Sequence, residues 1–195
     1  MSPSQQSDDG HVPVSQALDP RYSDDSAVAT PWVEALGRLT QAGVAWVVTT
    51  RPDGGPHATP MVPVVDDGRL YFHTATAEVK YANIQRQPRV LILAGDTQWT
   101  RGLDVAYAGR VEPVSDPATL ERLVDRWREK WDGRWRLERR GESVVNPEAK
   151  GGPDLVVFEV VPDRAHAYGK GTQFSHTAYT FNSDQGDPSQ ERSAS

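Results

Sequence analysis

Short runs of apolar and β-branched residues, separated by turn sequences, dominate the middle of the chain. The first run covers 44–51 and is followed by Pro-Asp-Gly-Gly, the second covers 57–65 and ends at Asp-Asp-Gly, and the third covers 69–74. Asp and Gly at such short breaks are typical of β-hairpin turns. The pattern therefore predicts three strands joined as an antiparallel meander.

Three further runs predict the rest of the sheet. Residues 89–96, with the sequence RVLILAGD, are apolar at consecutive positions, as in a strand that is buried on both faces. We therefore expect this strand to lie in the centre of the sheet. Residues 104–114 and 154–169 predict two more strands, both long.

Three segments show apolar residues at helical spacing. The first begins where Thr30 precedes Pro31, a pair typical of a helix N-terminus, and it stops near Gly43. The second covers 77–87, and its expected apolar face consists of Val79, Ala82 and Ile84. The third is capped by Asp116. Its apolar stripe consists of Leu120, Leu123, Trp127 and Trp131.

Six strands against three short helices predict a mainly β fold. Because the strands are mostly antiparallel, we expect a six-stranded antiparallel β-barrel, closed or half-closed, with short flanking helices. The folded domain is expected to cover 28–181. Residues 1–27 and 182–195 are rich in Ser, Gln, Asp and Pro and have no apolar period, so the sequence predicts a disordered tail at each end.

Composition excludes several functional classes. The 195 residues carry a formal net charge of −6, which does not fit a general nucleic-acid binder. There is no cysteine, which excludes disulfides, thiolate catalysis and cysteine-ligated metal sites. No apolar run has the length of a membrane span, and the N-terminus lacks the pattern of a signal peptide. We therefore expect a cytoplasmic protein that binds neither nucleic acid nor a membrane.

The stretch FHTATAEVKYANIQRQPRV, at 72–90, contains groups suited to an anion. The third predicted strand ends near Thr74 and Thr76, just before the N-terminus of a helix. A helix N-terminus offers free backbone N–H groups and the positive end of the helix dipole. Lys80, one turn into the helix, can fold back as a point charge. Taken alone, the pattern fits a phosphate site, or an ordinary strand-to-helix junction with a solvated lysine.

Between 49 and 90 the chain reads T-x-x-x-D-G-x-P-x-x-x-P, then F-x-T, then K-x-x-N-I-x-x-x-P-R-V. The residues at these positions are Thr49, Asp53, Gly54, Pro56, Pro60, Phe72, Thr74, Lys80, Asn83, Ile84, Pro88, Arg89 and Val90. Their order and spacing resemble the flavin-binding split-barrel family, the pyridoxamine 5'-phosphate oxidase-like superfamily. The branch that uses the deazaflavin coenzyme F420 is the most similar. The segments GRVEPVSDPATLERLVDRW and AYGKGTQFSHTAYTF resemble later parts of the family pattern, so the likeness covers about 31–181.

The resemblance implies a split-barrel domain that binds a flavin or deazaflavin at a homodimer interface. It implies that the phosphate is held at the end of the third strand and the following helix, by His73, Thr74, Thr76 and Lys80. It implies that the ring lies along the second strand, beside Thr59, Pro60, Met61 and Val62. Asn83 is implied to pack or cap the helix.

This chain lacks several positively charged residues that the pyridoxine-oxidising members of that family have. Those members place an arginine, a lysine and a Ser-Arg pair at positions where this chain has Thr59, Val64, Glu78 and Val79. Only Lys80 remains. The missing charges favour F420, whose anionic tail is longer and whose contacts are more dispersed, over FMN. The closing segment has Ala178 where relatives often have an arginine, so no active-site role is transferred to it.

The resemblance implies an oxidoreductase that transfers hydride between F420 or FMN and a small, electron-poor organic substrate. In such chemistry the cofactor carries the reactivity, which agrees with the lack of an obvious catalytic dyad. A proton, where one is needed, comes from solvent or from one of three candidates, His73, Tyr81 and Tyr168. Two alternatives stay open: a non-catalytic carrier of flavin, deazaflavin or haem, and an FMN-dependent oxidase of the pyridoxamine-phosphate type.

A basic segment and the histidines have simpler interpretations. Residues 121–140 concentrate positive charge and are interpreted as a solvated helix face. The alternative is a basic flap over an anionic ligand, made of Arg134, Arg136, Arg139 and Arg140. The neighbouring Trp127, Trp131 and Trp135 are interpreted as core and dimer contacts. The five histidines, at 11, 57, 73, 166 and 176, lack metal-ligand spacing and are interpreted as structural, so we expect no metal site.

Overall fold

The computed structural model describes residues 10–131, 136–149 and 154–182. Within these ranges the chain forms eleven strands and four helices. The strands are β1 (Ser15–Leu18), β2 (Ala45–Thr50), β3 (Pro56–Met61), β4 (Val64–Asp66), β5 (Arg69–Ala75), β6 (Arg89–Ala94), β7 (Gly102–Pro113), β8 (Glu138–Arg140), β9 (Ser143–Val145), β10 (Asp154–Lys170) and β11 (Ser175–Thr180). The helices are a 3-10 helix, η1 (Pro20–Tyr22), and the α-helices α1 (Trp32–Gln41), α2 (Val79–Arg86) and α3 (Pro117–Lys130).

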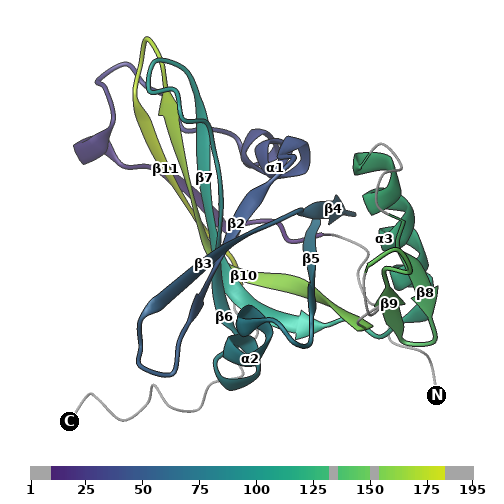
Figure 1. Cartoon of the computed structure of the whole chain (residues 1–195). Helices are drawn as coiled ribbons and strands as arrows, with labels where there is room; N and C mark the ends of the chain where they lie inside the picture. Colours follow the sequence, from purple (N-terminus) through teal and green to yellow (C-terminus); the bar gives the residue numbers. More distant parts are fainter. Residues whose placement is uncertain (1–9, 132–135, 150–153, 183–195) are drawn as a thin grey trace, which may run out of the picture.

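The strands form one antiparallel sheet that divides at β10. The main path runs β1-β11-β10-β7-β6-β2-β3. The first half of β10 pairs with β5 and β9, its second half pairs with β11, and β7 lies along its other edge. Figure 1 shows β5, β4 and the β8–β9 hairpin on the α3 side, while β11 and the upper part of β7 extend away from it.

The mainly β, antiparallel fold with three short α-helices agrees with the sequence prediction, but the strands are more numerous. The described residues contain eleven strands, whereas the sequence pattern suggested six. The run at 57–65 divides into β3 and β4, and β1, β8, β9 and β11 are additional. The prediction that 89–96 forms a central strand is correct, because β6 lies between β2 and β7.

The turns of the meander lie where the sequence places them. Gly54, between β2 and β3, has φ 85°, and Gly68, between β4 and β5, has φ 72°. These values lie in the left-handed region, which glycine enters without a Cβ clash. The Pro-Asp-Gly-Gly and Asp-Asp-Gly breaks therefore fix two hairpins and, with them, the register of β2 against β3 and of β4 against β5.

The helices agree with the sequence in position and differ in detail. Asp116 caps α3 as predicted, accepting the backbone N–H of Thr119 at 2.8 Å. The expected cap of α1 is wrong: its N-cap is Pro31, and Thr30 instead donates its backbone N–H to the hydroxyl of Thr177 at 2.9 Å. The carbonyl of Thr30 also accepts the Tyr179 hydroxyl at 2.6 Å. Thr30 thus attaches the start of α1 to β11.

Two apolar clusters fill the molecule, and β5 lies between them. The barrel core joins the sheet to α1 and α2, and its largest buried members are Leu39, Leu70, Phe72, Ile92, Tyr107, Phe158 and Tyr179. The α3 core lies under α3, and its members include Tyr71, Leu120, Leu123, Trp127, Leu137 and Val144. Successive side chains of a strand point to opposite faces. Consecutive residues of β5 therefore reach different cores, Phe72 the barrel core and Tyr71 the α3 core.

The N-terminal segment is part of the sheet from Ser15 onward. Ser15–Leu18, which the sequence pattern placed in a disordered tail, forms β1 and pairs with β11 from Ser15–Thr180 to Leu18–Thr177. Residues 1–9 and 183–195 lie outside the described residues. None of the helices in the described ranges is long and apolar enough to cross a membrane.

Candidate functional site

The end of β5 and the start of α2 meet at the candidate anion site. The buried face of α2 consists of Lys80, Asn83 and Ile84. The expected face of Val79, Ala82 and Ile84 is therefore wrong except for Ile84, since Val79 is exposed. Thr74 is buried and, by the alternation of β5, lies on the same strand face as Phe72. Lys80 and Thr74 thus lie on the inner side of their elements, whereas Thr76 is exposed.

Lys80 forms an ion pair close to its own position in the chain. Its side chain is 8% exposed, and its ammonium group donates to one carboxylate oxygen of Glu78. The other oxygen of Glu78 accepts the backbone N–H of Ala75 at 3.2 Å. Burial lowers the pKa of Lys80 below its usual value. The carboxylate of Glu78 therefore accepts hydrogen bonds from both the Lys80 ammonium group and the backbone N–H at the end of β5. The sequence had predicted that these two donors would be available to a phosphate.

His73 points to the other side of β5. Its ring packs edge-on against Trp127, with ring centroids 4.9 Å apart, and against Trp131 at 5.7 Å. Its Nε2 is buried and has no hydrogen-bond partner among the described residues. Burial, with a smaller contribution from the charge of Lys80, lowers the pKa of His73 to about 4. Although adjacent in sequence, His73 and Thr74 therefore face different cores, and His73 is neutral at neutral pH.

The residues implied to border the ring lie on β3 and just after it. Met61 is 7% exposed and belongs to the barrel core, whereas Pro60 is exposed. The hydroxyl of Thr59 is buried and has no hydrogen-bond partner in the part of the chain that the structure describes. The carbonyl of Val62 accepts the indole N–H of Trp127 at 3.1 Å. The hydrogen bond from Trp127 thus attaches the segment after β3 to α3. The hydroxyl of Thr59 is left without a partner among the described residues.

Asn83 connects the candidate anion site to the β2–β3 hairpin. Its side-chain amide donates to the hydroxyl of Thr49 at 3.0 Å in a buried position. The same hydroxyl lies 3.4 Å from Nδ1 of His57 on β3. The motif residues Thr49 and Asn83, 34 positions apart, therefore hold α2 against β2, in agreement with the packing role expected for Asn83.

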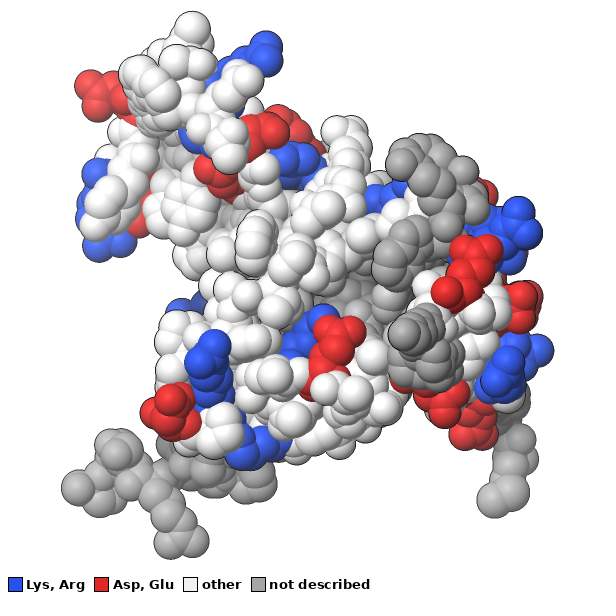
Figure 2. Space-filling view, in the orientation of Figure 1, with Lys and Arg blue, Asp and Glu red and all other residues white. Residues whose placement is uncertain are grey.

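Several arginines of the basic segment 121–140 form ion pairs in the part of the chain that the structure describes. Arg122 and Arg126 both contact the buried carboxylate of Asp66, at 3.3 and 3.2 Å. Arg139 contacts Glu121 at 2.9 Å. Of the remaining residues named for a flap, Arg136 and Arg140 are exposed, and Arg134 lies outside the described residues, as does Trp135. Figure 2 shows charged side chains gathered around α3, and a middle of the same face, over β2 and β3, that carries few charges.

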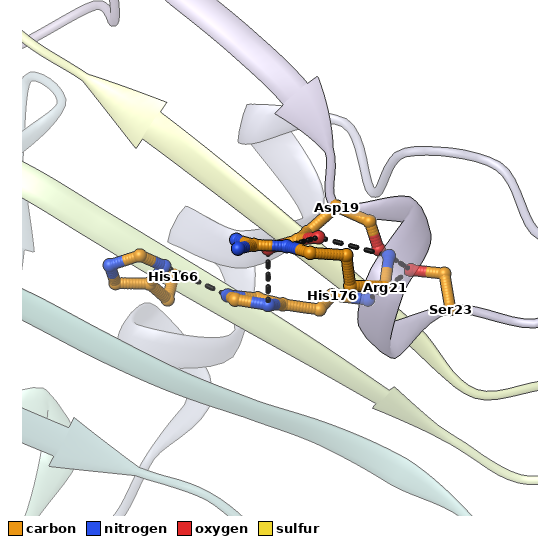
Figure 3. Close-up of polar contacts among 5 residues, drawn as sticks. All are labelled: Asp19, Arg21, Ser23, His166 and His176. Carbon is orange, nitrogen blue, oxygen red and sulfur yellow. Dashed lines mark hydrogen bonds and ion pairs between the residues drawn. The ribbon is translucent and has the colours of Figure 1, made fainter.

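The structure brings two histidines together that the sequence pattern left unconnected. Nδ1 of His166 lies 3.0 Å from Nε2 of His176, on the neighbouring strands β10 and β11 (Figure 3). Nδ1 of His176 lies 3.8 Å from the carboxylate of Asp19, which Arg21 also contacts at 2.7 Å. The hydrogen bond from Arg21 is the largest of the effects that lower the pKa of Asp19 to about 2. The network attaches η1 to the β10–β11 hairpin, and no group of acidic or histidine side chains in the described ranges could hold a metal ion.

Comparison with known proteins places this geometry in a family. The family model for pyridoxamine 5'-phosphate oxidase matches residues 33–169, well over half of the chain. The chain belongs to the pyridoxamine 5'-phosphate oxidase family. This family binds flavin-type cofactors and includes oxidoreductases. A comparison with curated proteins finds no match.

Solved structures of pyridoxamine 5'-phosphate oxidase-like proteins share the fold. The conserved hypothetical protein Rv2991 of Mycobacterium tuberculosis is 23% identical, with a TM-score of 0.59 over 75% of this chain and 89% of that one. A pyridoxamine 5'-phosphate oxidase-related, FMN binding protein of Nostoc punctiforme is 19% identical, with a TM-score of 0.52 over 81% and 94%. A putative pyridoxamine 5'-phosphate oxidase of Listeria innocua is 22% identical, with a TM-score of 0.51 over 68% and 94%. These likenesses establish the split-barrel fold.

Within this family member, sequence reasoning missed two features of the site. The family pattern presents Glu78 only as the absence of a cation, although a carboxylate two residues before Lys80 is visible in the sequence. The link between Trp127 and Val62 was not predicted, because it joins residues 65 positions apart and has no local signal.

Proposed function

We propose that the protein is an oxidoreductase that binds the deazaflavin coenzyme F420 in preference to FMN. It transfers hydride between this cofactor and a small, electron-poor organic substrate. The observation that carries the proposal is the free, buried hydroxyl of Thr59 on the strand implied to border the ring. A buried hydroxyl without a partner costs about 1–3 kcal/mol. A polar edge of a bound ring system would supply that partner.

The residues present fit the ring better than they fit a terminal phosphate. Thr59 offers its hydroxyl, and Met61, two residues further along the same strand, offers an apolar side chain that excludes water, while Val62 packs against the α3 core. Near Lys80, a phosphate meets the carboxylate of Glu78 first. The bound cofactor supplies hydride chemistry, while the chain binds it, orients it and keeps it dry.

No side chain is assigned as an acid or base. His73 is a poor proton donor at neutral pH, because its pKa of about 4 leaves the ring neutral. Tyr81 and Tyr168 remain candidates, and solvent is the simplest proton source.

The expected homodimer is supported by an uncovered apolar surface on the sheet. Trp46 on β2 is 50% exposed, and Leu93, its partner on β6, is 37% exposed. Val44, next to β2, is 59% exposed. A central strand that is apolar on both faces normally has both faces covered. A second copy of the chain would cover this one.

Trp46→Asp is expected to convert the dimer into monomer at micromolar concentration, because it places a charge in the centre of the uncovered apolar surface. Sedimentation velocity measures the change directly. Val33→Asp is the matched control, since Val33 is 76% exposed on α1 and lies outside this surface. A monomeric wild type, or a variant that sediments like the wild type, would contradict the proposed dimer.

Lys80→Ala is expected to weaken cofactor binding by about tenfold or more, because it removes a buried cation and leaves Glu78 unpaired beside an anionic tail. The measurement is fluorescence titration of F420 and FMN, side by side, against the wild type and the variant. We expect the wild type to bind F420 more tightly than FMN. Equal affinities of wild type and variant would remove Lys80 from the site, and no binding of either cofactor would refute the proposed function.

Turnover separates the oxidoreductase from the carrier. Reduced F420 mixed with the protein and a quinone or nitroaromatic should lose its reduced-state absorbance at a rate proportional to protein. Tight binding without any such consumption across a panel of acceptors would instead establish a binding protein.

A further inference from the structure

The carboxylate of Glu78 lies at the junction where a cofactor phosphate is expected. Each of its oxygens meets a different donor, one the ammonium group of Lys80 and the other the backbone N–H of Ala75 at 3.2 Å. Phosphate binding in proteins uses the same two kinds of donor, a lysine charge and backbone N–H groups at a helix start. Glu78 is itself the N-cap residue of α2, so it reaches back to the strand end from the position where such groups converge.

Burial restricts the Lys80 side chain, so its ammonium group can reach few other partners. Its side chain is 8% exposed, and among the described residues its hydrogen bond goes to Glu78. Glu78 differs in this respect, because its side chain is 45% exposed. The lysine is thus a fixed part of the junction, while the carboxylate can rotate into solvent.

The charges of the pair cancel. With Glu78 in place, the junction presents one cation and one anion, and a phosphate monoester dianion gains no net attraction from it. A dianion that displaces Glu78 still has that carboxylate as a neighbour, and like charges at short range repel. A ligand without a terminal phosphate monoester avoids this conflict.

We propose that Glu78 acts as an internal anion that fills the phosphate junction and selects against ligands ending in a phosphate monoester. This inference rests on the proposed function, and it makes Glu78 the residue that disfavours FMN. It predicts that flavin binding by the wild type depends on the ring and hardly on the phosphate.

The test compares FMN with riboflavin, which has the same ring and lacks the phosphate. Fluorescence titrations use the wild type, Glu78→Gln and Glu78→Gln/Lys80→Ala. The wild type should bind the two ligands within about threefold of each other. Glu78→Gln should bind FMN at least about tenfold more tightly than the wild type does, with riboflavin unchanged. The double variant should lose that gain, because the attraction comes from Lys80.

Two controls separate this effect from general changes in charge or fold. Glu112→Gln removes the same charge from another exposed carboxylate that is paired with an arginine, Arg110, and it should leave both affinities unchanged. Glu78→Ala serves as a second variant should the glutamine variant not fold, and it should show the same gain for FMN. Thermal melting checks that each variant folds.

Three outcomes would overturn the inference. They are an FMN affinity that does not rise in Glu78→Gln, a gain that FMN and riboflavin share equally, and a gain that survives the loss of Lys80. If riboflavin and FMN bind to none of the forms, the titration with F420 decides the proposed function separately. In that case millimolar inorganic phosphate still tests Glu78. It should raise the melting temperature of Glu78→Gln and leave those of the wild type and the double variant unchanged, and a shift common to all three would refute the inference.

Discussion

Trp127→Ala is expected to lower the free energy of unfolding by about 4 kcal/mol, as is usual for an aromatic side chain removed from a core. Trp127 is fully buried and is the largest such side chain in the described structure. It fills the centre of the α3 core, packs edge-on against His73, and donates its indole N–H to the carbonyl of Val62 at 3.1 Å. The substitution thus removes packing and leaves a backbone carbonyl without its partner.

Urea unfolding followed by circular dichroism measures this loss. Trp127→Phe should lose only about 1–2 kcal/mol, because it keeps a ring in the core and gives up mainly the hydrogen bond and some volume. Trp99→Ala is the surface control: Trp99 is 71% exposed, so its loss should stay below about 1 kcal/mol. If Trp127→Ala were as stable as the control, the α3 core would not hold the segment after β3.

Periodicity identified α3 correctly because its signals are local. The cap at Asp116 and the apolar residues that follow lie on one continuous helix, and Leu120, Leu123 and Trp127 are buried as predicted. The two hairpins β2–β3 and β4–β5 were predictable for a similar reason, since Asp-Gly turns favour hairpins between adjacent strands. The single meander was not, because the middle run divides and β3 does not pair with β5. What each element touches could not be read in the same way, because such contacts depend on partners far along the chain.

The face of α2 shows how a polar contact changes such a prediction. An apolar count places Val79 and Ala82 inside, yet Val79 is exposed and Lys80 is buried. Asn83 donates to the buried hydroxyl of Thr49, and Lys80 is buried although its ion-pair partner Glu78 is exposed. A pattern that assigns every polar side chain to the solvent-exposed face cannot predict that Lys80 and Asn83 are buried.

The short strands β1, β8 and β9 were missed because each has only three or four residues. Such segments have little intrinsic preference for a strand and gain their structure from pairing with longer ones. β1 lies in a polar segment and is held by β11, while β9 is held by β10.

The candidate site was only partly predictable. The sequence places Thr74 and Lys80 on either side of one strand-to-helix junction, and both are buried there, although the expected face of the helix left Lys80 outside. His73 does not join them, and the reason is elementary: adjacent residues of β5 point to opposite faces. The free hydroxyl of Thr59 has no signal in the sequence, since it depends on what surrounds β3.

Acid is expected to destabilise the protein through His73, with a loss of about 2 kcal/mol in the free energy of unfolding between about pH 7 and about pH 5. The folded chain holds the pKa of His73 at about 4, whereas the usual value is 6.5. Below about pH 6.5 the His73 side chain becomes protonated in the unfolded chain but stays neutral in the folded chain. Stability therefore falls as the pH decreases, and the loss is complete only below about pH 4.

His73→Phe isolates this effect. Phenylalanine keeps an aromatic ring against Trp127 and Trp131, removes the titrating group, and removes the buried Nε2 that has no partner among the described residues. The variant should match or exceed the wild type at about pH 5 and should lose much of the acid sensitivity. Some sensitivity should remain, because burial, assisted by the charges of His176 and Arg164, also lowers the pKa of His166.

Urea unfolding of both proteins at several pH values checks the sign and the size of the difference. The range above about pH 5 is the informative one, because most carboxylates are still ionised there and contribute little to the slope. Parallel stability curves for the wild type and His73→Phe would contradict a His73 that stays neutral in the folded chain. Curves that converge at neutral pH and separate toward about pH 5 would show that the ring is kept uncharged between the two tryptophans. A histidine in that state packs β5 against the α3 core and is unsuited to bind a phosphate by charge, which leaves Lys80, paired with Glu78, as the cation that we propose for the site.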